Sequence, residues 1–221
     1  MKNLKIFKNS KVIVTGHTGF KGSWLTVWLK QLDAKVMGIA LDPQTFPSHF
    51  QVSQISKGIK DVRLDIRDRK KIEKKIIAFK PNFVFHLAAQ ALVGASYKDP
   101  SLTWESNVFG TLNILESLRK LKNKCNVVII TSDKCYFNKE IHYGYKETDV
   151  LGGKDPYSGS KASAEILIKS YVNSFFNNKS NIRIATARAG NVIGGGDWAD
   201  NRIIPDCIIS WSKNKKAKLR N

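Results

Sequence analysis

The feature that most constrains this chain is a set of three glycines between an apolar run and an amphipathic run near the N-terminus. They stand at positions 16, 19 and 22, where the β-branched run 11–15 leads into the helix-periodic stretch 20–32. One glycine permits a tight turn, one lets the backbone approach a pyrophosphate, and one lets helix and strand pack closely. The start of the helix then offers N–H groups and partial positive charge to phosphates. The turn residues expected to contact a dinucleotide are Gly16, Thr18, Gly19, Phe20 and Gly22.

Short apolar runs and longer amphipathic stretches alternate along the rest of the chain. Continuous apolar strands that alternate with helices indicate βαβ units and a parallel sheet covered on both faces. The sequence therefore predicts an α/β fold, a Rossmann-type doubly wound parallel sheet. The polar stretch 42–60 is a long connection whose structure the pattern leaves open. Strands are expected at 11–15, 35–41, 61–65, 83–87, 127–130 and 183–187, and helices at 20–32, 68–80, 101–121 and 157–176.

The charge of the chain is strongly positive. Lys and Arg number 37 against 18 Asp and Glu, which gives a formal net charge of +19. Such a charge indicates either a basic face for nucleic acid or a solvated, lysine-rich surface. The lysines are spread along the chain and no nucleic-acid-binding module is present, so we favour the solvated surface and expect no nucleic-acid partner.

Composition and cysteine usage narrow the class of protein. A hydrophobic fraction of 42% excludes a wholly disordered chain. No apolar run reaches the roughly 18 residues of a membrane-spanning helix, and residues 1–10 lack the features of a secretory signal. The cysteines at 125, 135 and 207 are odd in number without metal-type spacing, which is typical of thiols in a reducing compartment. We expect a cytoplasmic protein with no membrane partner and no metal.

Residues at the ends of later strands predict how the dinucleotide is held. Asp42 stands twenty residues after the last glycine, where a carboxylate accepts hydrogen bonds from ribose hydroxyls and repels a 2′-phosphate. No arginine stands beside it in the sequence, so we prefer NAD over NADP. Asp65 either reaches the adenine or is an N-cap or turn residue for the next helix. Other residues that the cofactor is expected to contact at the ends of the third and fourth strands are Ile66, Leu87, Ala88 and Ala89, the last three also being compatible with simple core packing.

A Tyr-x-x-x-Lys pattern is the clearest candidate for catalysis. Tyr157 and Lys161 stand four positions apart in the sequence, so they share one face of a helix. An ammonium group near a phenol lowers the pKa of the phenol and makes tyrosine a base near neutral pH. The pattern is common in isolation. Here it follows a dinucleotide turn and the hydroxyl-bearing strand end Thr131-Ser132, which makes it more specific.

With these motifs in place, the chain resembles the extended short-chain dehydrogenase/reductase superfamily over essentially its whole length. Within it the chain is similar to the CDP-glucose 4,6-dehydratases. An epimerase or reductase of the same superfamily and a catalytically inactive NAD-binding module are the alternatives. The segments that carry the closer resemblance are 16–25 (GHTGFKGSWL), 85–90 (FHLAAQ), 131–136 (TSDKCY), 155–158 (DPYS) and 188–198 (RAGNVIGGGDW).

The resemblance implies a set of roles. Ser132, Tyr157 and Lys161 form a dehydrogenase triad with Asn107 as a supporting fourth member, and Tyr157 and Lys161 also contact NAD. Asp133 and Lys134 stand where a dehydratase keeps its elimination residues, and Asp-Lys here argues against an epimerase. Asp133 is the expected acid unless it is only a turn residue; Lys134 is either the C5 base or a group that stabilises the enolate. Expected substrate-binding residues are Asn191 and Arg202.

The implied reaction is NAD-dependent loss of water from a nucleotide sugar, CDP-glucose giving a 4-keto-6-deoxy product, as in deoxysugar and O-antigen biosynthesis. Acid chemistry by Asp133 requires an environment that raises its pKa, and base chemistry by Lys134 requires burial or nearby positive charge. The resemblance further implies a homodimer paired through the helices near 101–121 and 157–176.

The resemblance also predicts the domain organisation. Residues 1–187 are expected to form the NAD-binding domain with the catalytic residues, and residues 188–221 the start of a smaller sugar-nucleotide-binding domain. Relatives in the family are longer, so we expect weak or no turnover from these 221 residues alone.

Several side chains near these motifs have a structural alternative. Lys21 assists anion binding or points to solvent. His17 stabilises its loop by a hydrogen bond, and His86 is a hydrogen-bonded core histidine. Cys135, although next to a lysine that would lower its thiol pKa, is expected to serve packing. The side chains at i and i+4 that are expected in the core are Trp24 and Trp28.

Overall fold

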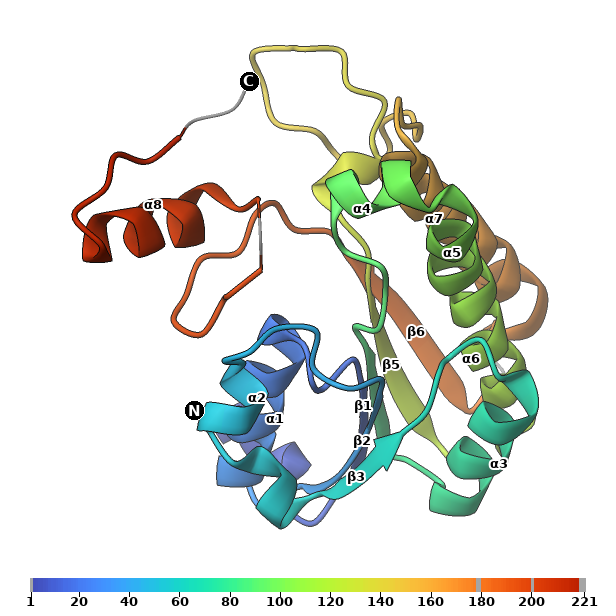
Figure 1. Ribbon diagram of the computed structural model, residues 1–221. Helices are drawn as coiled ribbons and strands as arrows, with labels where there is room; N and C mark the ends of the chain where they lie inside the picture. Colours follow the sequence, from blue (N-terminus) through green and yellow to red (C-terminus); the bar gives the residue numbers. More distant parts are fainter. Residues whose placement is uncertain (1, 178–179, 200, 219–221) are drawn as a thin grey trace.

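The protein has a six-stranded, all-parallel sheet with helices on both faces, seen in a computed structural model that describes residues 2–177, 180–199 and 201–218 (Figure 1). The strand order is β3-β2-β1-β4-β5-β6, so the chain reverses direction across the sheet between β1 and β4. The predicted doubly wound Rossmann-type fold is confirmed. The strands are β1 (Lys11–Thr15), β2 (Lys35–Ala40), β3 (Lys60–Arg63), β4 (Phe83–His86), β5 (Cys125–Ile130) and β6 (Ile182–Ala187).

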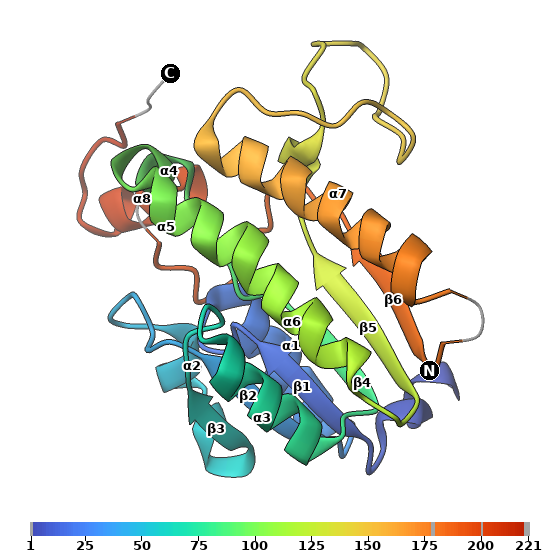
Figure 2. The ribbon, with the colours of Figure 1, turned by 90° about the vertical axis from the view of Figure 1, so that its right-hand side faces the viewer.

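One face of the sheet carries the larger core. Helices α3 (Arg69–Phe79), α6 (Gly110–Arg119) and α7 (Pro156–Phe175) lie across it (Figure 2). The apolar stripes of these helices meet the buried side chains of the central strands, because each helix repeats its apolar residues every three or four positions. Buried residues that join helices to strands there include Ile13, Val84, Ile129, Ile72, Ile114 and Ile168.

The other face is covered by α1 (Phe20–Gln31), whose Leu29 packs with Val12, Val14 and Val36. The expectation that Trp24 and Trp28 lie in the core is wrong, since they are 47% and 51% exposed. Their spacing does place them on one face of α1, but the helix turns its small residues toward the sheet. Those residues are Gly22, Ser23 and Thr26.

The helix predicted at 101–121 is built from three pieces. Helix α5 (Pro100–Trp104) leads into a π-helical turn (Glu105–Phe109), which leads into α6. Asp99 caps α5 by accepting a hydrogen bond from the Leu102 N–H, with proline at the first helical position. The π turn contains Asn107, a predicted site residue, and π turns in α-helices are frequent at functional sites.

The remaining elements lie in the connections between the strands and the larger helices. Connection 42–60, which the sequence left open, holds a short helix α2 (His49–Val52) and a 3₁₀ turn (Ile55–Gly58). Further elements that the sequence analysis did not predict are α4 (Val93–Lys98) and α8 (Ile203–Ser212), the latter lying apart from the sheet (Figure 1). No helix in the described part of the chain is both long and apolar enough to cross a membrane.

Candidate active site

The glycine turn after β1 has the geometry that its sequence predicts. Gly16 has a φ of +73°, a left-handed conformation that favours glycine. A Cβ on Gly22 would lie 2.1 Å from the carbonyl oxygen of Gly16, so only glycine permits this approach of helix and turn. Gly19 begins α1 without a side-chain cap, which leaves the first N–H groups of the helix available to an anion.

A cleft opens above the carboxyl ends of β1 and β4, where the strand order reverses. Open parallel sheets bind ligands at this position. A dinucleotide fits this cleft because the glycine cradle and the uncapped helix start form one wall of it. Predicted cofactor residues that line the cleft are Gly16, Thr18, Gly19, Phe20, Gly22, Asp42, Asp65, Ile66, Leu87, Ala88 and Ala89.

Asp42 has an arginine neighbour that the sequence did not reveal. The Nε atom of Arg63 lies 3.4 Å from Oδ1 of Asp42, and Arg63 also donates to the Leu41 carbonyl at 3.1 Å. The two meet because β2 and β3 pair in parallel, with Ala40 opposite Arg63. The argument that no arginine stands beside Asp42 is therefore wrong. The Asp42 side chain is 86% exposed and remains free to meet a ribose.

Asp65 lies at the cleft and does not cap the next helix. Its carboxylate accepts hydrogen bonds from the Arg67 N–H at 2.8 Å and from the Arg67 guanidinium at 2.8 and 3.0 Å. Hydrogen bonding from Arg67 lowers the pKa of Asp65. The cap of α3 is Asp68, which accepts from the Lys71 N–H. Asp65 is therefore a turn residue before α3 and not its N-cap, and it also lines the cleft.

His86 connects the floor of the cleft to the π turn. Thr15 Oγ1 accepts from the N–H groups of Leu87 and Ala88, both at 3.1 Å, so its own proton goes to His86 Nδ1 at 2.7 Å. His86 must then carry its proton on Nε2, which lies 3.2 Å from Thr111 Oγ1. Burial lowers the pKa of His86 to about 3, with Lys161 contributing. The predicted role as a hydrogen-bonded core histidine is confirmed.

His17 also has the predicted role, since its Nε2 lies 2.9 Å from Asp61 Oδ1 and fixes the turn to β3. Burial lowers the pKa of His17 despite this carboxylate.

Asn107 is fully engaged by hydrogen bonds within the protein. Its side-chain oxygen accepts from the Gln90 N–H at 2.8 Å, while its amide nitrogen donates to the Gln90 carbonyl at 3.1 Å and to Ser160 Oγ at 2.9 Å. Asn107 is 2% exposed. It thus joins the cleft wall at Gln90 to the helix that carries Tyr157 and Lys161.

Ser132, Asp133 and Lys134 form a compact group just past β5. Ser132 Oγ donates to Asp133 Oδ1 at 3.0 Å and accepts from the Lys134 N–H at 3.2 Å. Lys134 Nζ lies 3.4 Å from the same Asp133 oxygen. The side chains of Asp133 and Lys134 are 48% and 39% exposed, so the burial that the elimination roles call for is absent at this point of the structure.

Tyr157 and Lys161 lie on one face of α7, with Lys161 Nζ 6.0 Å from the centre of the Tyr157 ring. Burial raises the pKa of Tyr157, and a hydrogen bond with Ser132 opposes the rise. The expected lowering of the phenol pKa is therefore wrong for this arrangement, because desolvation outweighs the effects of Ser132 and Arg202. Burial lowers the pKa of Lys161 to about 8, and the charge of Lys21 adds to the effect.

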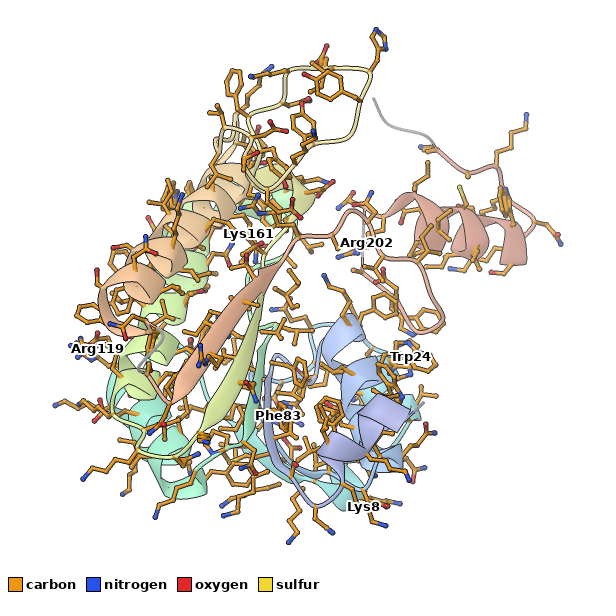
Figure 3. The ribbon with its side chains drawn as sticks, turned by 180° about the vertical axis from the view of Figure 1, so that it is seen from behind. Lys8, Trp24, Phe83, Arg119, Lys161 and Arg202 are labelled. Atoms are coloured by element: carbon orange, nitrogen blue, oxygen red, sulfur yellow. The ribbon has the colours of Figure 1, made fainter. Side chains whose placement is uncertain are left out.

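Lys21 lines the cleft but stays exposed at its surface. Partial desolvation lowers the pKa of Lys21, Arg202 lowers it further, and Asp133 opposes them. Arg202 lines the cleft and lies 3.4 Å from Asp197. Figure 3 shows Lys161 and Arg202 toward the same end of the molecule, with Lys8 at the opposite end. Cations from α1, α7 and the start of α8 thus lie close enough to shift one another's pKa values.

Asn191 is exposed and is not among the residues that line the cleft. The predicted catalytic residues do not line it either; they are Asn107, Ser132, Asp133, Lys134, Tyr157 and Lys161. Asn191 follows Gly190, where an added Cβ would lie 3.6 Å from Oδ2 of Asp133. Conversely, sequence reasoning gave no role to Gln90 or to the segment Gly196–Ala199, all of which line it. Gln90 does belong to one of the segments that carry the family resemblance, but only its contacts with Asn107 reveal what it does.

Cys135 is fully buried, and burial raises the pKa of its thiol to about 11. The predicted packing role fits this burial, and the lowered thiol pKa that a neighbouring lysine suggested is wrong.

Fold and cleft together define a Rossmann-type nucleotide-binding protein. A family model described as GDP-mannose 4,6 dehydratase matches residues 13–220, so the chain belongs to this family. It is 46% identical to the CDP-glucose 4,6-dehydratase of Salmonella typhimurium over the whole chain, spanning 63% of that relative. It is 29% identical to the dTDP-D-glucose 4,6-dehydratase of Dictyostelium discoideum over 95% of the chain and 50% of that relative.

Solved structures agree with the fold. The UDP-glucose 4-epimerase of Thermus thermophilus, solved in complex with NAD, has a TM-score of 0.72 at 29% identity, covering 86% of this chain and 58% of that one. The epimerase Mth375 of Methanothermobacter thermautotrophicus has a TM-score of 0.80 at 24% identity, covering 97% and 61%. The chain therefore spans about three fifths of the length of these proteins.

Proposed function

We propose that this chain holds the NAD-binding and catalytic part of a nucleotide-sugar 4,6-dehydratase whose substrate is CDP-glucose. The observation that carries the proposal is the group Ser132, Tyr157 and Lys161 beside a glycine-turn cleft, in a chain 46% identical to a CDP-glucose 4,6-dehydratase. We assign residues 1–187 to the cofactor domain and 188–221 to the start of the substrate domain; residues 200 and 219–221 of that segment lie outside the described residues. A homodimer in the cytoplasm completes the proposal.

NAD would be held by the glycine turn at the pyrophosphate and by Asp42 at the adenosine ribose. The carboxylate of Asp42 and the relatives solved with NAD support this choice, although Arg63 removes the sequence argument against NADP. When bound, NAD supplies a hydride acceptor and donor for the sugar.

The side chains of this chain supply the proton transfers. Tyr157 takes the proton of the sugar 4-hydroxyl, and Ser132 donates a hydrogen bond to the same oxygen. Lys161 stabilises the phenolate that this requires. The resulting 4-ketone acidifies the C5 hydrogen. Lys134 removes that hydrogen or stabilises the enolate, and Asp133 donates a proton to the departing 6-hydroxyl, so that one water leaves.

The test is incubation of the chain with NAD and each of CDP-, dTDP-, GDP- and UDP-glucose. We expect at most weak formation of a product one water lighter that carries a ketone, and this from CDP-glucose. Tyr157→Phe keeps the aromatic ring but lacks the hydroxyl, and this variant should form no product. Lys134→Met tests the elimination step. Full turnover by this variant would refute both roles of Lys134. A product of unchanged mass would identify an epimerase instead.

Cofactor binding is measured separately by titration calorimetry, so that an inactive chain is still informative. NAD binding without turnover would support the interpretation of 188–221 as an incomplete substrate domain. Absence of NAD binding would contradict the proposed function.

A further inference from the structure

A buried carboxylate joins the two elements that carry Ser132, Tyr157 and Lys161, which are β5 and α7, to the end of β6. Glu165 lies on α7, one turn beyond Lys161, and is 5% exposed. Its oxygens accept hydrogen bonds from Arg188 Nε at 3.0 Å and Nη2 at 2.9 Å. Oε1 also accepts a hydrogen bond from the hydroxyl of Thr131. A carboxylate so buried needs such partners to remain charged.

One partner of Glu165 is adjacent to the proposed catalytic group, and the other contacts the segment that follows this group. Thr131 directly precedes Ser132 at the end of β5, and its N–H donates to the Ala187 carbonyl at 3.0 Å. Arg188 follows β6, and its guanidinium lies 4.8 Å from the centre of the Tyr136 ring. Arg188 Nη1 also donates to the Glu147 carbonyl at 3.3 Å. One carboxylate therefore holds β5, β6 and α7 at fixed separation.

The electrostatics of Glu165 agree with a preserved charge. Burial raises the pKa of Glu165, but hydrogen bonds from Arg188 and Thr131 outweigh it and leave the pKa below its ordinary value. The hydrogen bond to Glu165 likewise raises the pKa of Arg188. A pair of buried charges costs desolvation energy that a hydrophobic pair avoids, so its presence calls for a reason other than stability.

We propose that Glu165 is a positioning residue, which through Thr131 and Arg188 holds the Tyr157–Lys161 face of α7 against the strand end that carries Ser132. The catalytic purpose of this positioning rests on the proposed function, whereas the positioning itself rests on the hydrogen bonds of Glu165 alone. Ser132 and Tyr157 can act on one substrate oxygen only if β5 and α7 keep one separation, and Glu165 makes side-chain hydrogen bonds from α7 to the ends of both β5 and β6.

Thr131→Val tests the link without changing charge or side-chain shape. Loss of the hydroxyl frees the end of β5 from Glu165, so Ser132 moves relative to Tyr157 and lowers the pKa of Tyr157 less. We expect the pKa of Tyr157, followed by NMR of ¹³Cζ-labelled tyrosine in the 221-residue chain, to rise by about half a unit. Thr131→Ser retains the hydroxyl and should restore the original titration. An unchanged Tyr157 titration in Thr131→Val would overturn the proposal, since a purely structural role moves only the unfolding temperature.

Glu165→Gln tests the charge itself. The substitution removes a negative charge near Lys161 and leaves Arg188 unpaired, so both changes disfavour the protonated lysine. We expect the pKa of Lys161, followed by NMR of ¹³Cε-labelled lysine, to fall by about one unit from its value of about 8. A Lys161 titration that does not move would count against the proposal. Other titratable and charged groups that face Lys161 are Lys21 of α1, His86 of β4, Cys135 after β5 and Tyr157 of α7.

Two further measurements keep the outcomes separate. If Glu165→Gln does not fold, the Thr131 pair alone decides the proposal, because neither Thr131 variant leaves a buried charge unpaired. NAD binding by the unaltered chain, measured by calorimetry, tests the proposed function. Absence of NAD binding together with shifted titrations in the variants would therefore reject the function and keep the positioning role.

Discussion

His86 makes the stability of this fold sensitive to acid in a way that can be worked out in advance. Its imidazole is neutral and fully enclosed, and burial lowers its pKa to about 3 from an ordinary value of 6.5. Below about pH 6.5, His86 therefore binds a proton in the unfolded chain but not in the folded chain. Folded His86 thus contributes stability above pH 6.5 that is lost progressively as pH falls from about 6.5 toward 3.

The magnitude follows from the two pKa values. Each pH unit between them costs about 1.4 kcal/mol, so lowering the pH from about 7.5 to 4.5 removes about 2.7 kcal/mol of unfolding free energy through His86 alone. Folded domains have only about 5–15 kcal/mol in total, so this loss is large enough to measure.

Urea unfolding at a series of pH values, read by tryptophan fluorescence, measures this slope. His86→Gln lowers stability at neutral pH because two hydrogen bonds are disturbed, but its stability should fall less steeply below pH 6.5, by about 1.4 kcal/mol per unit. His142→Gln is the matched control, since His142 is exposed, and its curve should parallel that of the unaltered chain. Parallel curves for His86→Gln and the unaltered chain would refute the reasoning.

Three further predictions concern the cleft and the thiols. Gly22→Ala should weaken NAD binding by about 100-fold, because the new Cβ meets a backbone oxygen at 2.1 Å, whereas Gly94→Ala, whose Cβ meets nothing within 4 Å, should bind normally. Asp42→Ala should weaken NAD about tenfold in calorimetry and strengthen NADP, and equal losses for both would contradict its proposed ribose contact. Cys125 and Cys135, whose thiol pKa values burial raises to about 12 and 11, should react with a disulfide reagent only after urea unfolding.

The order of strands and helices could be predicted because each element carries its own period. The predicted strands all end within two residues of the observed ones, and the glycine turn fixed the first strand–helix unit. The exposed tryptophans could not be predicted, because an i, i+4 pair defines a shared face but not which face meets the sheet. The face of α1 that meets the sheet is determined by Gly22 and Ser23, whose small size allows close packing.

The candidate site was predictable in its residue types but less so in its environment. Arg63 approaches Asp42 only because two strands pair in register, a contact between residues far apart in the sequence. The raised pKa of Tyr157 depends likewise on burial, which local spacing does not encode. Glu165 resembles any helix-surface acid in the sequence, and its meaning comes from Thr131 and Arg188.

The π turn at Glu105–Phe109 has a consequence for how helices α5 and α6 are oriented. An α-helix advances about 100° per residue, so one extra residue within a turn rotates everything after it by about that angle relative to everything before it. Helix α6 can therefore present Ile114 and Leu118 to the sheet while Asn107, in the π turn before it, faces Gln90 and Ser160. Deletion of one residue from this turn would restore a continuous α-helix. The residues before and after the turn could then not both keep their present orientations. The chain would then have to give up either its core contacts or the placement of Asn107.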